Sequence, residues 1–139
     1  MIFQLPLYNT LQKTFTMGLK KNTEAVFKWI EAFNEHDIEK LLALYDKDAT
    51  HFSPRLKKKH PKTKGKIKGK KALRKWWEEA FEKLPTLNYK LTMVVVFKES
   101  ISIVYERKVK KEKTQEVGEA LKFKNGLIIE SAVVDITDK

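Results

Sequence analysis

The sequence contains no cysteine, and this absence excludes several kinds of site. Without thiols the chain can form no disulfide, no zinc–thiolate centre and no cysteine nucleophile. Its three histidines are scattered and do not have the spacing of a metal-binding motif. A glycine-rich phosphate loop and a Ser–His–Asp signature are also missing. We therefore expect a site that uses neither a metal nor an organic cofactor.

Long apolar runs are missing as well. No stretch of about 18 apolar residues is present, so the sequence predicts no membrane-spanning helix. The segment Met1–Met17 has no basic start followed by an apolar run and a small-residue cleavage site, so it does not resemble a signal peptide. We expect a cytoplasmic protein in which residues 1–21 form a tail or packing arm.

Acidic residues are absent from one long segment. Ala49–Trp77 contains twelve lysines and arginines and no aspartate or glutamate, whereas the remainder carries 17 basic and 18 acidic residues. The net charge of +11 therefore comes from one basic segment in a nearly neutral domain. A nucleic-acid-binding domain more often has a basic face spread across it. The basic loop expected at 55–68 is either a solvated loop or an attractor of nucleic acid, acidic lipid or an anionic substrate.

What is present suits a single packed domain, since 42% of the 139 residues are hydrophobic. Apolar spacing predicts three helices. The first begins with a cap at Asn22, and the second is short, is capped by Asp37 and has Tyr45 on its apolar side. The third begins near Gly69 and ends before Pro85.

The pattern then changes to the alternation typical of strands. Ala49–Ser53 is expected as a first strand, and Asn125–Gly126 predicts a tight hairpin turn near the end of the chain. The remaining strands are predicted at Leu87–Phe97, Ile101–Val109, Glu116–Lys124 and Leu127–Ile136. Helices followed by consecutive strands predict an α+β domain over residues 22–139, in which a cone-like curved antiparallel sheet wraps around the three helices and encloses a cavity.

The order of short sequence motifs resembles the nuclear transport factor 2-like superfamily, in its SnoaL-like and ketosteroid-isomerase-related branch. The resemblance covers residues 22–136 and implies the same cone, an internal ligand pocket and a homodimer formed through the outer face of the sheet. The motifs that carry it are Trp29-Ile30-Glu31-Ala32-Phe33-Asn34, His36-Asp37-Ile38, Leu44-Tyr45-Asp46-Lys47-Asp48-Ala49-Thr50, Ile67-Lys68-Gly69-Lys70-Lys71-Ala72-Leu73 and Phe123-Lys124-Asn125-Gly126-Leu127-Ile128.

The steroid isomerases of this superfamily use a carboxylate base directly before a proline, and Ser53 occupies that position here. Their oxyanion-binding tyrosine falls on Trp29, and their supporting tyrosines fall on Tyr45 and Trp77. The position of their protonated acid is occupied by Glu119. Because a serine hydroxyl cannot shuttle a proton as a carboxylate does, steroid isomerisation by that mechanism is excluded. Trp29, Tyr45, Ser53 and Trp77 remain candidates for lining the pocket.

His51 is the strongest candidate for chemistry. It lies two positions before Ser53 on a predicted strand, so both side chains face the same way, and its ordinary pKa suits proton transfer near neutral pH. Glu119 shares its strand face with apolar residues, which predicts a pocket acid that has either a raised pKa or a partner, unless the position lies at an edge facing solvent. Asp135 is a third candidate for the pocket wall.

Either face of the strand 101–109 could line the cavity. Ile101, Ile103 and Tyr105 form one apolar face, whereas Val104 and Glu106 lie on the other. The apolar pattern favours the first face, and the resemblance favours the second.

Three functions remain open. The first is a small-molecule-binding domain that catalyses cofactor-free proton transfer on a small apolar carbonyl compound as an isomerase, lyase or cyclase, with His51 as base and Glu119 as proton donor or orienter. The second is a non-catalytic binding or dimerisation module. The third is binding of an anion or nucleic acid through the basic loop, with Lys57, Lys58 and Lys59 as contacts.

Overall fold

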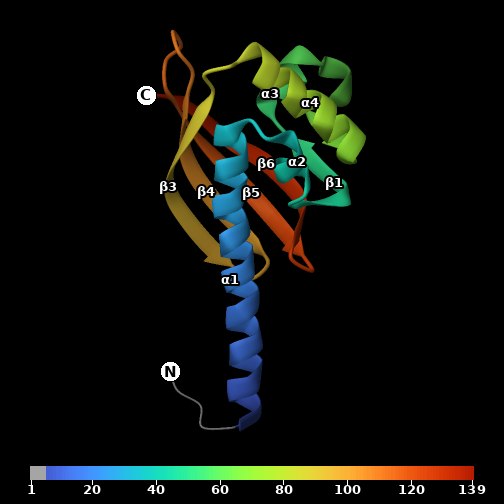
Figure 1. The fold of residues 1–139 in the computed structure, drawn as a ribbon, viewed down its shortest axis with the longest axis vertical. Helices are drawn as coiled ribbons and strands as arrows, with labels where there is room; N and C mark the ends of the chain where they lie inside the picture. The colour runs from blue at the N-terminus through green and yellow to red at the C-terminus, as the bar shows by residue number, and fades with distance from the viewer. Residues whose placement is uncertain (1–5) are drawn as a thin grey trace.

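A long helix packs across the concave side of a curved six-stranded sheet, and shorter helices close one end (Figure 1). The structure is a computed structural model that describes residues 6–139, with side chains from residue 17 onward. The α+β cone expected from the sequence is confirmed. Four strands follow the helices in the order and nearly at the boundaries that the alternation predicts.

The first helix, α1, spans Pro6–Glu35, so its expected start at Asn22 is wrong. Pro6 is tolerated in a first turn, and no other proline interrupts the helix. Asn22 is instead a buried residue inside the helix. The helix is continuous across residue 21, where the N-terminal arm was expected to end. Its N-terminal half projects beyond the sheet (Figure 1). Residues 1–5 of that arm lie outside the described residues.

The second helix, α2, spans Ile38–Leu42, and the side chain of Asp37 caps it as predicted by accepting a hydrogen bond from the Lys40 backbone. The chain then enters β1, Tyr45–Phe52. This strand is longer than the sequence suggests, and it includes Tyr45, which the apolar spacing placed on the second helix.

The basic segment is folded rather than a loop. It contains α3 (Pro54–Lys59), a 3₁₀ turn (Pro61–Thr63) and β2 (Lys66–Lys68). Ser53 caps α3 and Pro54 begins it, a combination that favours a helix start. The repeated lysines hide this local signal. Next, α4 spans Lys70–Lys83, as the apolar stripe predicts.

The last four strands form a meander: β3 (Asn88–Phe97), β4 (Ser100–Lys108), β5 (Gln115–Lys124) and β6 (Leu127–Asp138). The sheet order is β2-β1-β6-β5-β4-β3, and every neighbouring pair is antiparallel except β1 and β6. Asn125 and Gly126 both have positive φ in the β5–β6 turn, which confirms the predicted hairpin.

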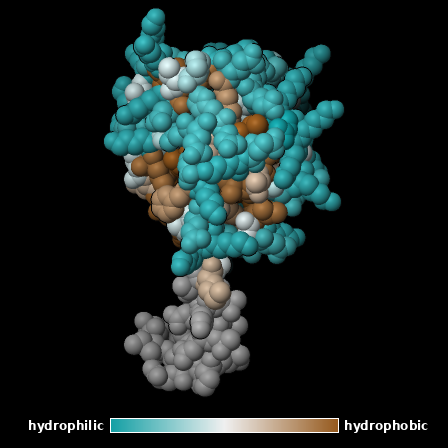
Figure 2. All heavy atoms as spheres, in the orientation of Figure 1, coloured by the Kyte–Doolittle hydropathy of each residue, from teal (hydrophilic) through white to brown (hydrophobic). Residues whose placement is uncertain are grey.

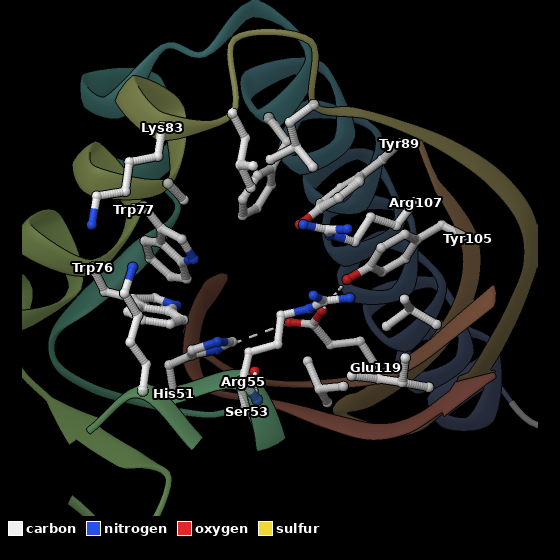
Figure 3. Close-up of a pocket in the computed structure, with 18 of the residues that line it drawn as sticks. His51, Ser53, Arg55, Trp76, Trp77, Lys83, Tyr89, Tyr105, Arg107 and Glu119 are labelled. Carbon is white, nitrogen blue, oxygen red and sulfur yellow. Dashed lines mark hydrogen bonds and ion pairs between the residues drawn. The ribbon is translucent and has the colours of Figure 1, made fainter. Parts of the chain in front are cut away.

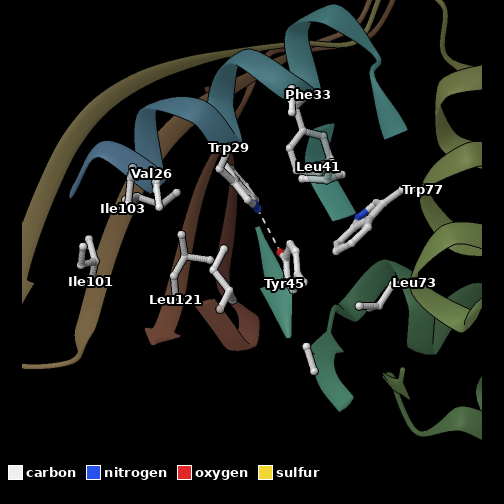
Figure 4. Close-up of a cluster of buried hydrophobic side chains, with 14 of the residues drawn as sticks. Val26, Trp29, Phe33, Leu41, Tyr45, Leu73, Trp77, Ile101, Ile103 and Leu121 are labelled. Atoms are coloured by element: carbon white, nitrogen blue, oxygen red, sulfur yellow. Dashed lines mark hydrogen bonds between the residues drawn. The ribbon is translucent and has the colours of Figure 1, made fainter. Parts of the chain in front are cut away.

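The core lies between α1 and the sheet (Figure 4). Trp29 is its central side chain, and its indole N–H donates a 3.0 Å hydrogen bond to the Tyr45 hydroxyl. Ile101, Ile103 and Tyr105 of β4 are buried, so the apolar pattern identifies the inner face of that strand and the alternative from the resemblance is wrong. This core fixes the position of β4 and β5 beneath the cavity.

The side of the molecule that carries α1 is mostly hydrophilic, with hydrophobic patches on either side of the helix (Figure 2). Among the described residues, no helix combines the length and apolar character that crossing a bilayer requires.

Candidate functional site

A cavity of about 610 Å³ opens between α4, α3 and the concave face of the sheet (Figure 3). Trp76 and Trp77 form its wall on the α4 side, and Tyr89, Tyr105 and Arg107 form the wall on the sheet. The volume falls within the range of pockets that hold small organic molecules. The cavity is therefore large enough for a ligand of one or two rings.

His51 and Glu119 face one another across the floor of this cavity (Figure 3). His51 Nδ1 lies 4.0 Å from Glu119 Oε2, and both side chains are almost fully buried. Burial penalises the charged form of each group. It lowers the pKa of His51 to about 4 and raises the pKa of Glu119 to about 7. The pair therefore combines a neutral imidazole with a carboxyl that holds its proton up to near-neutral pH.

A line of buried hydrogen bonds fixes the imidazole from behind. Trp29 donates to the Tyr45 hydroxyl, which donates to Ser131 Oγ at 3.0 Å, and Ser131 Oγ lies 2.7 Å from His51 Nδ1. Ser131 is completely buried on β6. Because Nδ1 is engaged by Ser131, the ring presents Nε2 as its other nitrogen for a ligand.

Two tyrosines lie beside the acid. The Tyr105 hydroxyl donates a 2.7 Å hydrogen bond to Glu119 Oε1, while Glu119 Oε2 is buried without a hydrogen-bond partner among the described residues. The ring of Tyr89 packs against that of Tyr105, with centroids 4.3 Å apart and the ring planes tilted by 32°. Burial raises the pKa of both phenols, so both keep their protons and can donate hydrogen bonds to a ligand.

Hydrogen bonds from α1 fix the position of Tyr89. The Asn34 side chain bonds both backbone groups of Tyr89, accepting from its N–H at 2.7 Å and donating to its carbonyl at 2.9 Å. This pair of bonds joins the C-terminal end of α1 to the start of β3. The helix therefore sets the position of the cavity wall as well as the core.

Of the residues predicted for the site, His51, Ser53, Trp77 and Glu119 all line the cavity. Trp29 and Tyr45 do not line it, because their polar atoms bond one another in the core behind the cavity wall. The Ser53 hydroxyl accepts a 3.2 Å bond from the backbone N–H of Arg55 as the cap of α3.

Asp135 does not belong to the cavity wall: it is exposed, and its carboxylate accepts a hydrogen bond from Thr137. A register shift between β5 and β6 is the reason. Gly118 pairs with Asp135 but the next residue, Glu119, pairs with Val133, so the strand contains a bulge. The bulge reverses the alternation, which turns Val133 and Ile136 into the cavity and Asp135 outward.

The three lysines predicted to bind anions lie on α3, but they do not all face the cavity. Lys58 and Lys59 reach the mouth of the cavity, whereas Lys57 is exposed and does not line it. Lys59 pairs with Glu79 of α4 at 2.9 Å, and Lys83 pairs with the same carboxylate at 2.7 Å. Glu79 therefore offsets part of the positive charge of the basic segment.

Two arginines that sequence reasoning did not place in the pocket also line it. Arg107 continues the alternation of Ile103 and Tyr105, so strand parity could have identified it once that face was chosen. Arg55 was hidden in a segment expected to be a loop. Among residues 17–139, no three His, Asp or Glu side chains gather in a way that could hold a metal ion.

The cone, its helices and its cavity define a domain of the nuclear transport factor 2-like superfamily. Within it, the chain belongs to the SnoaL-like family, whose profile matches residues 26–131. No curated protein sequence matches the chain.

Solved structures share this fold at low sequence identity. A SnoaL-like protein of unknown function from Burkholderia thailandensis superposes with a TM-score of 0.75 at 21% identity, over 83% of this chain and 93% of that one. A proposed polyketide cyclase from Sinorhizobium meliloti superposes with a TM-score of 0.68 at 13% identity, over 80% and 94%. TerC, co-crystallised with polyporic acid, superposes with a TM-score of 0.71 at 15% identity, over 82% and 90%.

Proposed function

We propose that the cavity binds a small, largely apolar carbonyl compound and that His51 and Glu119 transfer a proton on it without a cofactor. The observation that carries this proposal is the pair itself. Two buried groups whose pKa values are shifted in opposite directions face one another in the same cavity. Pairs of this kind are typical of acid–base sites.

The chemistry follows from the charges of the pair. Neutral His51 takes a proton from the carbon next to the ligand carbonyl, and the electron pair of that C–H bond forms the carbon–carbon double bond of an enol. The carbonyl oxygen takes the proton of Glu119 in the same step. Return of a proton to a different carbon isomerises the ligand, and loss of a leaving group or attack on a second carbonyl gives a lyase or a cyclase.

The short distance between the two groups lowers the cost of this step. After proton transfer the pair is an imidazolium and a carboxylate, and each charge alone is costly in a buried site. With 4.0 Å between Nδ1 and Oε2 the two charges form at once and attract one another. Tyr105 adds a hydrogen bond to the carboxylate as it forms.

Relatives with this fold support a small-molecule role. One of them is a proposed polyketide cyclase, and another is TerC, which was crystallised with polyporic acid. Trp76 and Trp77, together with Phe33 and Leu87, give the carbonyl ligand an apolar surface on which to pack.

Exchange of carbon-bound hydrogen for deuterium tests the proposal directly. We expect the protein to accelerate exchange at the acidic carbon of 2-tetralone in D₂O, followed by proton NMR. His51→Ala and Glu119→Gln are expected to reduce the rate by at least about a hundredfold. His60→Ala and Glu116→Gln are matched controls, because both side chains are exposed and neither lines the cavity. Binding of 2-tetralone without exchange would instead favour the non-catalytic module.

A further inference from the structure

The cavity has a cationic end that the proton-transfer step does not use. Arg107 is almost fully buried on β4, and Arg55 reaches the same region from α3. Figure 3 shows both guanidinium groups directed into the cavity beside Tyr89 and Tyr105. A buried guanidinium stays charged, so a pair of them is costly unless anions balance it.

The nearby carboxylates balance only part of this charge. Arg107 has one ion pair, 3.1 Å from Glu112 on the exposed β4–β5 hairpin. Arg55 donates to the neutral amide oxygen of Gln115 and has no carboxylate partner among the described residues. Burial lowers the pKa of Arg55, and the positive charge of Arg107 lowers it further. One carboxylate therefore faces two guanidinium groups.

Glu119 forms no ion pair with either arginine among the described residues, since its carboxylate contacts the Tyr105 hydroxyl at 2.7 Å and lies 4.0 Å from His51. Burial raises the pKa of Tyr89, and the positive charges of Arg107 and Arg55 both oppose that rise. For Glu119, by contrast, burial raises the pKa and only the Tyr105 hydrogen bond opposes it. The arginines are therefore not the counter-ions of Glu119 and remain available to a ligand.

We propose that the ligand of this cavity is an amphipathic acid, whose carboxylate binds Arg55 and Arg107 and whose apolar body packs on Trp77. Two planar guanidinium forks suit the two oxygens of a carboxylate, and the Tyr89 hydroxyl can add a third donor. Phe33 and Leu87 extend the apolar surface on which the body packs. The substrate would thus be a keto acid or an aromatic acid with an enolisable carbonyl, an assignment of reaction that rests on the proposed function.

A matched pair of ligands separates the anion site from apolar binding. 2-Naphthoate and 2-acetylnaphthalene have the same ring system and differ in whether the substituent is charged. We expect calorimetry at about pH 6, where Glu119 keeps its proton, to show at least about tenfold tighter binding of 2-naphthoate. Equal affinity of the two compounds for the wild-type protein would overturn the proposal.

Arginine variants locate the site. Arg55→Gln is expected to weaken 2-naphthoate binding by about tenfold and to change the affinity for 2-acetylnaphthalene by less than about threefold. The matched control is Arg74→Gln, because Arg74 lies on the surface of α4, pairs with Glu39 and Glu78 and does not line the cavity. If Arg74→Gln weakened naphthoate binding as much as Arg55→Gln, the effect would be one of net charge and the site would be elsewhere.

A charge-conserving variant guards against loss of folding at the more buried arginine. Arg107→Lys keeps the positive charge but loses the planar fork, so we expect weaker 2-naphthoate binding with the urea midpoint nearly unchanged. Unchanged binding in both Arg107→Lys and Arg55→Gln would overturn the proposal. The proton-transfer proposal is tested separately, by the effect of His51→Ala and Glu119→Gln on deuterium exchange. Neither of these variants is expected to change the preference for 2-naphthoate.

Discussion

His51 Nδ1 and Glu119 Oε2 lie 4.0 Å apart in a region that solvent barely reaches. In water, a histidine and a glutamate at this distance would form an ion pair near neutral pH. Here burial lowers the pKa of the histidine to about 4 and raises that of the acid to about 7, so both groups are neutral between these values. The fold therefore keeps the acid and the base in the protonation states that the proposed reaction needs.

Glu119 is expected to destabilise the protein as the pH rises. Its pKa is about 7 in the fold against 4.5 as the ordinary value, so its contribution is most favourable below pH 4.5 and is lost as the pH rises through 7. The full difference amounts to about 3 kcal/mol. Glu119→Gln should therefore gain stability over the wild type between about pH 5 and pH 8, measured by urea unfolding. Glu130→Gln on the exposed side of β6 is the control, and parallel pH profiles of Glu119→Gln and wild type would contradict the expectation.

His51 is expected to act in the opposite direction. Its pKa is about 4 in the fold against 6.5, so its contribution is complete above pH 6.5 and is lost as the pH falls through 4. Relative to the wild type, His51→Gln should therefore gain about 3 kcal/mol of unfolding free energy as the pH falls from 6.5 to 4. The difference between variant and wild type is measured by urea unfolding, because Glu119 changes the wild-type profile in the opposite direction over much of this range. His60→Gln, at an exposed position, should keep the wild-type slope. Parallel pH profiles of His51→Gln and wild type would contradict the assignment of this acid sensitivity to His51.

Strand alternation predicts much of this site from the sequence. His51 near the end of β1 and Ser53 directly after the strand are both buried and both line the cavity, and Val117, Glu119 and Leu121 share one face of β5, as a period of two requires. The bulge in β6 breaks that period, and no glycine or proline in β6 marks it. This is why Asp135 was predicted for the pocket although it faces outward.

Contacts between side chains that are distant in the sequence are harder to predict than the strand face on which a side chain lies. Trp29 and Tyr45 were expected in the pocket, but a hydrogen bond between residues 16 positions apart keeps both in the core. Arg55 reaches the cavity because Ser53 and Pro54 begin a short helix within the basic segment. The lysines around it are typical of a solvated loop, and they mask the two residues that form the cap.

The outer face of the sheet gives a prediction about assembly. Val95 and Phe97 of β3 and Val134 of β6 are 52%, 67% and 68% exposed. Ala120 and Ala132, which pair across β5 and β6, add small side chains to the sheet beside Val134. We propose that two copies pair through this face, as the family resemblance implies, because apolar patches of this kind mark interfaces.

A charge placed in this face should dissociate the pair. We expect light scattering to give the mass of a dimer for the wild type and that of a monomer for Val95→Lys. Lys71→Glu, on the exposed side of α4, changes charge without touching the sheet and should remain dimeric. A wild-type mass near the 16.3 kDa of one chain at all concentrations tested would contradict the prediction.

Ser131 should contribute to stability more than its size suggests. Its hydroxyl accepts from Tyr45 and contacts His51 Nδ1, so Ser131→Ala leaves two buried polar groups without their partner. The expected loss of unfolding free energy is about 1–3 kcal/mol. Ser102→Ala, at an exposed position on β4, is the matched control and should change stability by less than about 0.5 kcal/mol. Ser131→Ala removes the acceptor of the Tyr45–Ser131 hydrogen bond and Tyr45→Phe removes its donor, so the two effects should be non-additive in the double variant. Additive losses would mean that the three side chains do not act as one hydrogen-bonded unit and that the imidazole is held by packing against Trp77 alone.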